Sequence, residues 1–174
     1  MLAAALLAAT LAAPPDLAGS WRAALDLAGG PLRFTITISD TGSDRSGQLC
    51  NGSRCDDLSS IDIRGDTVIF GIADYDATIT AVMSGDSLAG TYRNVGNRGP
   101  RSISFRAVRG TWEAEPATPA LSGSWDVRLL LDGRTSPRVL RIWNTDLGLE
   151  GTWLSATGDY GLFWGRAESD SFSL

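Results

Sequence analysis

The chain has 174 residues, of which 43% are hydrophobic and 20% are charged, so its length allows one domain or two small ones. Its 15 basic residues are all arginine and are outnumbered by 20 acidic residues, which gives a net charge of −5. This charge argues against a basic surface for nucleic acid or for an anionic membrane. The chain has no histidine, which excludes Ser-His-Asp and Cys-His catalysis and the zinc motifs built on histidine.

The first 13 residues are apolar, and Pro14, Pro15 and Asp16 follow them. This run is shorter than the roughly 20 residues that a helix needs to cross a bilayer. It resembles the apolar region of a secretory signal, so we expect residues 1–16 to be a signal peptide. The protein would then be exported, to the periplasm or the outside of a bacterial cell envelope. The alternatives are a short Ala/Leu helix and a start codon that lies upstream of the true one.

Residues 17–110 have the pattern of short strands joined by tight turns. The segment 32–38 is the clearest strand, because apolar and polar residues alternate along it with a period of two. Clusters of Gly, Asp, Asn and Ser separate the segments and predict turns. We expect eight strands, at residues 21–27, 32–38, 46–50, 58–63, 68–72, 78–83, 88–92 and 103–107. The predicted fold class is therefore all-β, an antiparallel meander that curls into a lipocalin-like barrel.

The segment Leu17-Ala18-Gly19-Ser20-Trp21 returns almost unchanged, 104 positions later, as Leu121-Ser122-Gly123-Ser124-Trp125. Repetition on this scale predicts two copies of one unit. We expect a first repeat at 17–110, a Pro-rich linker at 111–120 and a second, incomplete repeat at 121–174. The second repeat should contain five strands, at residues 125–131, 138–143, 149–154, 160–166 and 171–174. We expect it to be marginally stable unless it packs on the first copy or further strands follow in the parent chain.

Large apolar side chains indicate where the core lies. Trp21 and Trp125 begin equivalent strands, and we expect each ring to plug one end of its barrel. Phe34, Phe70 and Phe105 should fill the interior of the first barrel. An eight-stranded barrel is either filled by side chains or just wide enough for one small ligand, and both alternatives stay open here. A further aromatic group either lines a pocket or covers the first barrel: Trp143, Trp153, Phe163 and Trp164.

The two cysteines, Cys50 and Cys55, enclose Asn51-Gly52-Ser53-Arg54, a segment with the composition of a hairpin tip. In an oxidising compartment this spacing favours a disulfide that closes a small loop. The alternatives are free thiols and a redox or metal site. A redox pair usually has two intervening residues, and a zinc site needs further soft ligands.

Arg93, Asn94, Arg98 and Arg101 surround a Gly-rich turn near the end of the first repeat. One interpretation is a solvated turn. The other is a contact with a protein partner or an anion, because the guanidinium group binds carboxylates in a bidentate manner.

Several acidic residues lie close together in the sequence: Asp56, Asp57, Asp74, Asp76 and Asp159. A glycosidase needs two carboxyl groups that face one substrate. We expect these residues to lie in turns, where an aspartate bonds to the local backbone. No stretch supplies the spaced oxygen ligands of a calcium loop. We therefore predict no catalytic residue, no metal site and no cofactor.

The chain resembles the β-barrel region that precedes the thioredoxin-like domain in exported TlpA-type disulfide reductases of bacteria. The resemblance is carried by residues 17–21, 86–94, 99–101, 123–125 and 157–161. It implies an accessory region of an exported redox protein, with a thioredoxin-like domain downstream as its partner. The active site of that family is a Cys-x-x-Cys pair in the thioredoxin-like domain. No such pair occurs here, so no catalytic role is carried over to Cys50 or Cys55.

We therefore expect a non-enzymatic accessory or binding module of an exported thioredoxin-like protein. The alternative is a lipocalin-like carrier of a small apolar ligand, and a hydrolase that uses turn carboxylates is a third. The barrel interior distinguishes the first two. A continuous pocket of roughly a few hundred Å³ would support the carrier. Complete filling by seven side chains would exclude it: Trp21, Phe34, Ile36, Ile38, Phe70, Ile79 and Phe105.

Overall fold

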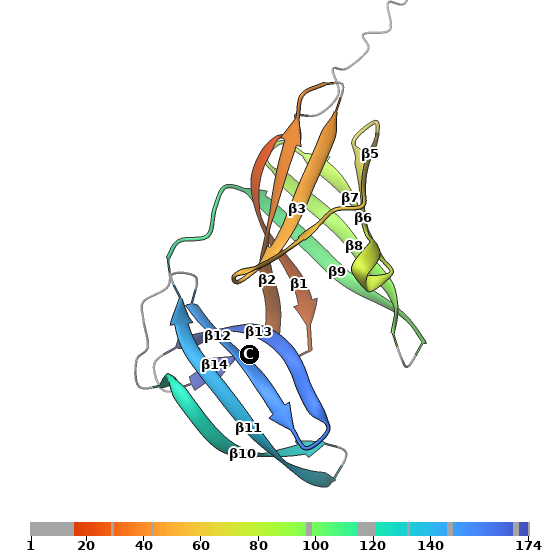
Figure 1. Ribbon diagram of the computed structural model, residues 1–174. Coiled ribbons are helices and arrows are strands. Elements are labelled where there is room, and N and C mark those ends of the chain that lie inside the picture. Colours follow the sequence, from red (N-terminus) through yellow and green to blue (C-terminus); the bar gives the residue numbers. More distant parts are fainter. Residues whose placement is uncertain are drawn as a thin grey trace, which may run out of the picture.

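The computed structural model describes residues 16–28, 30–42, 44–96, 99–114, 121–131, 133–145, 148–168 and 171–173. Within these ranges the chain forms two antiparallel β-sheets, with one short 3₁₀ turn, η1 (Ala73–Tyr75), between two strands (Figure 1). The predicted all-β fold class is therefore confirmed. The search for a membrane-spanning helix, made over these residues, finds no helix of sufficient length and hydropathy. The expected signal peptide and the interior of the linker lie outside the described residues.

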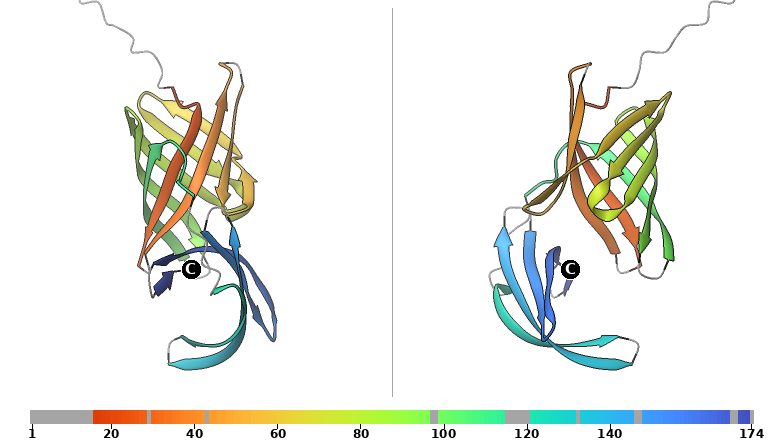
Figure 2. Two further views of the ribbon diagram at one scale, coloured as in Figure 1. Left: turned by 90° about the vertical axis from the view of Figure 1, so that its left-hand side faces the viewer. Right: turned by 45° about the vertical axis from the view of Figure 1, so that its right-hand side comes forward.

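The larger sheet, called here the barrel sheet, contains nine strands that run in the order β4-β3-β2-β1-β9-β8-β7-β6-β5. The sheet curls around its own interior (Figure 2). Its strands are β1 (Gly19–Leu27), β2 (Gly30–Asp40), β3 (Arg45–Asn51), β4 (Arg54–Asp57), β5 (Ser60–Arg64), β6 (Thr67–Ile72), β7 (Ala77–Ser84), β8 (Ser87–Gly96) and β9 (Gly99–Arg109).

The period-two alternation of the sequence explains this curl, because one face of each long strand is apolar and packs inward. In β2, for example, Phe34, Ile36 and Ile38 are buried, whereas Thr37 between them is exposed. The phenylalanines expected in the core, Phe34, Phe70 and Phe105, are each at most 4% exposed. The inward faces of β1, β2, β6, β7 and β9 thus form one hydrophobic core.

The two edges of the barrel sheet meet at a corner between β4 and β5. The backbone N–H of Leu58 donates to the carbonyl of Gly47 on β3, at 2.8 Å. The N–H of the next residue, Ser59, donates to the carbonyl of Gly71 on β6, at 2.9 Å. The chain therefore passes from one edge of the sheet to the other at residues 58–59.

The sequence predicted eight strands for this repeat, and the structure has nine. The additional strand is β4, which carries the sequence Arg54-Cys55-Asp56-Asp57. It escapes pattern analysis because it is short and polar and has no alternation of apolar residues. It forms because it pairs with β3 across a hairpin, with Cys50 opposite Cys55.

The smaller sheet, called here the small sheet, contains β10 (Gly123–Leu131), β11 (Arg134–Thr145), β12 (Gly148–Ser155), β13 (Gly158–Glu168) and β14 (Ser171–Ser173), paired in sequence order. Apart from a β-bulge between Thr152 and Leu154, its pairing reproduces that of the barrel sheet with an offset of 104 positions. Gly19 pairs with Ile38, as Gly123 pairs with Ile142. Arg64 pairs with Thr67, as Glu168 pairs with Ser171. By this correspondence β13 is the continuous equivalent of β4 and β5 together.

The third strand of each copy has a glycine at an equivalent position, Gly47 and Gly151, where it lies close to the neighbouring strand. A side chain at Gly47 would lie 3.0 Å from the carbonyl oxygen of Thr37. A side chain at Gly151 would overlap the carbonyl oxygen of Arg141, which is the residue equivalent to Thr37, and the ring of Phe163. Only glycine permits this close approach of neighbouring strands.

The two repeated tryptophans, Trp21 and Trp125, make the same local hydrogen bond but have different surroundings. The indole N–H of Trp21 donates to the carbonyl of Leu17, at 3.0 Å, and that of Trp125 donates to the carbonyl of Leu121, also at 3.0 Å. The Trp21 ring is completely buried, with the Arg109 guanidinium carbon 4.5 Å from its centroid. The prediction of a core plug is therefore confirmed for Trp21.

The same prediction is wrong for Trp125, whose side chain is 43% exposed. In the barrel sheet, β1 lies between β2 and β9, and Trp21 is opposite Arg109 of β9. In the small sheet, β10 is an edge strand, and no described strand pairs with its other side. The ring of Trp125 consequently lacks the cover that β9 provides for Trp21.

Candidate ligand site at the barrel mouth

The hairpin between β3 and β4 is closed by a disulfide between Cys50 and Cys55, whose Cα atoms lie 4.0 Å apart. The predicted disulfide is thus present. It ties the two strands together at the point where the turn begins, and Asn51, Gly52 and Ser53 lie beyond it at the hairpin tip. The disulfide therefore limits the conformations available to the tip.

This hairpin tip holds Glu150 of β12, which is only 3% exposed. The backbone N–H of Ser53 donates to Glu150 Oε1, and its hydroxyl donates to Glu150 Oε2 at 2.9 Å. The indole N–H of Trp143 donates to the same Oε2 atom at 3.3 Å. A buried carboxylate without such donors would be strongly unfavourable. The two hydrogen bonds from Ser53 therefore join the barrel sheet to the small sheet, whereas the bond from Trp143 of β11 lies within the small sheet.

Gly52 is required at this contact for two reasons. Its φ is +60°, a conformation that side chains disfavour. A Cβ atom at this position would also overlap Glu150 Oε1. The hairpin tip can therefore approach Glu150 only because residue 52 has no side chain.

Tryptophans surround the disulfide hairpin on the side of the small sheet. Trp164 shares a narrow crevice of about 30 Å³ with Cys50, Gly52 and Trp112. Trp112 donates its indole N–H to the carbonyl of Phe34 at 2.9 Å, which anchors the chain after β9 to β2. Trp164 thus covers the first repeat, which is one of the two predicted roles of the aromatic group.

The ring of Phe163 packs against Trp153, with 5.9 Å between their centroids. Phe163 also lines a cavity at the mouth of the barrel sheet, so the second predicted role, lining a pocket, applies to this residue. Both alternatives therefore occur, at different residues of the group.

The cavity at the barrel mouth has a volume of about 220 Å³. Its apolar wall is formed by side chains of the barrel interior: Leu25, Leu32, Phe34, Leu49, Ile72 and Ile79. Its rim carries most of the polar groups: Asn51, Ser53, Arg54, Asp56, Tyr75, Tyr92 and Glu150. Leu162 and Phe163 of the small sheet complete the lining. The cavity therefore has an apolar interior and a polar entrance and lies between the two sheets.

The remainder of the barrel interior is filled. All seven side chains expected to fill it belong to the buried core. Trp21, Ile36, Phe70 and Ile79 show no exposed area at all. Filling is complete around Trp21, whereas the opposite end opens into the cavity. The sequence left open whether the barrel interior is filled by side chains or contains a cavity. The structure has packed side chains around Trp21 and a cavity at the opposite end.

Asp56, Arg54 and Tyr75 form a connected polar group on the rim. Arg54 Nε lies 3.2 Å from Asp56 Oδ1, and the Tyr75 hydroxyl donates to Asp56 Oδ2 at 3.2 Å. Burial, together with the negative charge of Asp56, raises the pKa of Tyr75 above its usual value. Burial also raises the pKa of Tyr92. Both phenols therefore remain protonated at neutral pH and present hydroxyl groups at the rim.

One amide of the rim has an unused acceptor. Asn51 Oδ1 is buried and accepts no hydrogen bond from the described residues. Such an atom costs free energy unless a donor reaches it. Asn51 lies at the disulfide-closed tip and is one of the residues that line the cavity.

The predicted partner-contact residues lie at the far ends of β8 and β9. Asn94 and Arg101 are directly opposite one another, and Arg93 and Arg101 are exposed. Asn94 is half-buried, and its Oδ1 atom has no described partner. Arg98 lies outside the described residues. Of this set, Arg101 acts on the cavity rim, since its charge lowers the pKa of Tyr92 against the larger effect of burial.

The aspartates have mixed positions. Asp74 and Asp76 lie at η1 and at the residue that follows it, as expected for turn residues. Asp56 and Asp57 lie in β4 and Asp159 lies in β13, so the predicted turn position is wrong for these three. No group of three or more metal-ligating side chains is found among the residues that the structure describes.

Sequence reasoning missed Glu150, Asn51, Tyr75 and Tyr92 as site residues. Glu150 contacts Ser53 across 97 positions of sequence, and no local pattern reports such a contact. The signal that was available is the Asn51-Gly52-Ser53 tip, which was interpreted as a turn alone.

Comparison of the chain with family models, with curated proteins and with solved structures gives no match in any of the three.

Proposed function

We propose that the chain is a non-enzymatic binding module whose cavity at the barrel mouth holds one small ligand. The observation that supports this proposal most strongly is the combination of an apolar wall from the barrel interior with a polar rim that includes Glu150 of the small sheet. A small-molecule site typically has this composition, with a few polar groups that orient a largely apolar ligand. The volume of about 220 Å³ lies below the usual range of roughly 300–1,000 Å³, which restricts the ligand to a small molecule.

Binding to the full chain can be tested by isothermal titration calorimetry with small amphipathic probes that share one apolar body. Leu32→Trp should abolish binding, because the larger ring occupies the cavity that Leu32 lines. The matched control is Leu130→Trp, which makes the same change at a side chain that is 68% exposed on β10. Equal binding by the two variants would contradict the proposed site.

We also propose that this module belongs to an exported protein of the TlpA type. The disulfide supports this proposal, because structural disulfides form in oxidising compartments. The test is the gene sequence beyond the codon for Leu174. A continuous reading frame with a thioredoxin-like Cys-x-x-Cys segment is expected, and its absence would overturn the assignment.

A further inference from the structure

We infer that the ligand of the mouth cavity is a small primary amine with an apolar body, bound as the ammonium ion. This inference rests on the proposed function and names the class of ligand for the same site. It follows from three properties of the lining, which are an unused acceptor, a negative formal charge and several aromatic rings.

The unused acceptor is Asn51 Oδ1, which is buried and lacks a described partner. An acceptor of this kind is satisfied by an N–H or O–H group of the ligand and not by a carboxylate. The disulfide holds the hairpin tip on which Asn51 lies, so this amide stays beside the cavity.

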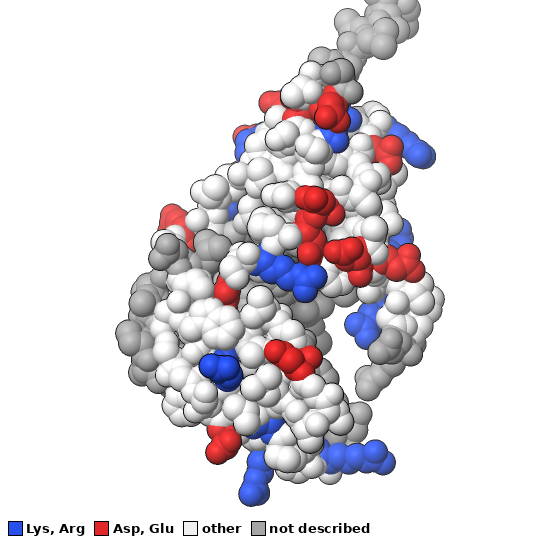
Figure 3. Space-filling model, viewed as in Figure 1, with Lys and Arg blue, Asp and Glu red and all other residues white. Residues whose placement is uncertain are grey.

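The formal charge of the lining is negative, because it contains two carboxylates, Asp56 and Glu150, and one guanidinium, Arg54. Arg54 is paired with Asp56. The groups that donate to Glu150 are the neutral ones of Ser53 and Trp143. Asp74 adds negative charge beside the rim, since it acts on both Tyr75 and Arg54. Figure 3 shows acidic side chains gathered beside a basic one on this face of the barrel sheet.

A cationic head is favoured by this charge, and an anionic head is disfavoured. Aromatic rings strengthen the preference, because the face of a ring attracts a cation within roughly 6 Å of its centroid. Four rings line the cavity: Phe34, Tyr75, Tyr92 and Phe163. The apolar body of the ligand would then contact the leucine and isoleucine side chains deeper in the barrel.

The experiment compares three probes that differ only in the polar head: 2-phenylethylamine, 2-phenylethanol and phenylacetate. Calorimetry on the full, disulfide-bonded chain at neutral pH should give the amine the tightest binding, by about tenfold over the alcohol. Phenylacetate should bind most weakly. If the alcohol or phenylacetate binds as tightly as the amine, the ligand class is wrong and the proposed function stands. If none of the three binds, the proposed function itself fails.

Two matched variants test the charge. Asp56→Asn removes a carboxylate of the rim and should weaken binding of the amine about tenfold and that of the alcohol much less. Asp57→Asn removes the adjacent carboxylate, which accepts a hydrogen bond from Gln48 outside the cavity. This substitution should change neither the binding of the amine nor that of the alcohol. Equal effects of the two substitutions on the amine would overturn the inference. A second measurement needs no variant: the affinity of the unmodified chain for the amine should fall as the salt concentration rises. An affinity for the amine that does not depend on salt would also contradict the inference.

Discussion

Gly52 and Glu150 depend on one another, although they belong to different sheets. The missing side chain of Gly52 leaves the space in which the Glu150 carboxylate accepts two hydrogen bonds from Ser53. Hydrogen bonds to a buried charge are among the stronger polar contacts in a protein. The absence of a side chain at Gly52 thus permits the two hydrogen bonds between Ser53 and Glu150 that connect the repeats.

Gly52→Ala should lower the free energy of unfolding by about 2 kcal/mol or more, because it combines an unfavourable φ with an overlap on Glu150. Gly65→Ala is the matched control, since Gly65 has a φ of +65° and no atom near the position of a Cβ. Its cost should be about 1 kcal/mol. Urea denaturation measures both, and equal costs would show that Gly52 does not need the space beside Glu150.

Trp21 and Trp125 provide a second matched pair at this scale. Both donate to the carbonyl four residues earlier, so their replacement by alanine removes the same hydrogen bond. Trp21→Ala should cost about 3–5 kcal/mol, and Trp125→Ala should cost about half as much because 43% of its side chain is exposed. Denaturation followed by circular dichroism gives both values. Equal losses of stability in the two variants would mean that the Trp125 ring is as well packed as the Trp21 ring.

Among the elements, the β3–β4 hairpin differs most from its equivalent in the second repeat. Cys50 and Cys55 correspond by the constant offset to Leu154 and Asp159, which are also directly opposite one another. Replacing both cysteines by serine should lower the free energy of unfolding by about 2 kcal/mol. Reductant should then have no further effect on the variant. A wild-type chain that is alkylated by iodoacetamide without reductant would contradict the disulfide.

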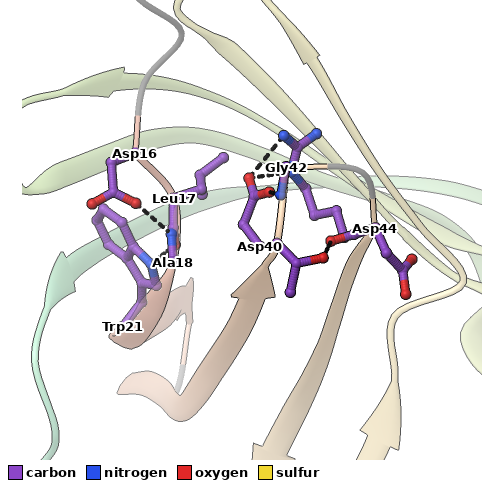
Figure 4. Close-up of polar contacts among 9 residues, drawn as sticks. Asp16, Leu17, Ala18, Trp21, Asp40, Gly42 and Asp44 are labelled. Atoms are coloured by element: carbon purple, nitrogen blue, oxygen red, sulfur yellow. Dashed lines mark hydrogen bonds and ion pairs between the residues drawn. The ribbon is translucent and has the colours of Figure 1, made fainter.

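Asp40, at the β2–β3 turn, makes the free energy of unfolding depend on pH in the acidic range. The Asp40 carboxylate accepts hydrogen bonds from the backbone N–H of Gly42 at 2.9 Å and from Arg45 Nε at 2.8 Å (Figure 4). The Gly42 bond, followed by the Arg45 bond, lowers the pKa of Asp40 below 3.8. The folded state therefore binds fewer protons here, and the stabilisation is complete above pH 3.8 and is lost as the pH falls through the folded-state pKa.

Asp40→Asn should consequently reduce the slope of stability against pH below 3.8. Arg45→Gln should reduce it less, because the Gly42 bond is the larger cause. Thermal unfolding at a series of acidic pH values measures both slopes. If Arg45→Gln removed as much of the slope as Asp40→Asn does, the Gly42 bond would make no contribution, which would contradict the order of the two causes.

For the whole molecule, the hydrogen bonds between Ser53 and Glu150 connect the small sheet to the barrel sheet. Figure 2 shows the two sheets as neighbouring bodies of the chain. Glu150→Ala should release the small sheet and increase the radius of gyration measured by small-angle X-ray scattering. Asp126→Ala, at an exposed position on β10, is the control and should leave it unchanged. An unchanged radius in both variants would mean that the aromatic contacts around Trp164 hold the sheets together without the carboxylate.

The sequence was sufficient for those features of the fold that depend on local patterns. Alternation located β2 and placed Phe34 in the core, and the cysteine spacing indicated the disulfide. It was insufficient where a residue depends on distant neighbours. The exposure of Trp125 reflects the open edge of β10, and the polar strand β4 forms only because β3 lies beside it. The cavity needs Glu150 and Phe163 from the second repeat, so no single stretch of sequence could reveal it.

The constant offset between the two repeats has a consequence for their history. Paired positions at the start and at the end of the stretches Gly19–Ile69 and Gly123–Ser173 match with one displacement, and the pairing differs between them at the β-bulge of Thr152 and Leu154. Since the duplication, these two stretches have therefore diverged by exchange of amino acids without net gain or loss of length. Cys50, Cys55, Gly52 and Glu150 are among the exchanged positions, since the equivalent residues of the other repeat are Leu154, Asp159, Ala156 and Ser46. The disulfide and the contact between the repeats are therefore features that one copy has and the other lacks.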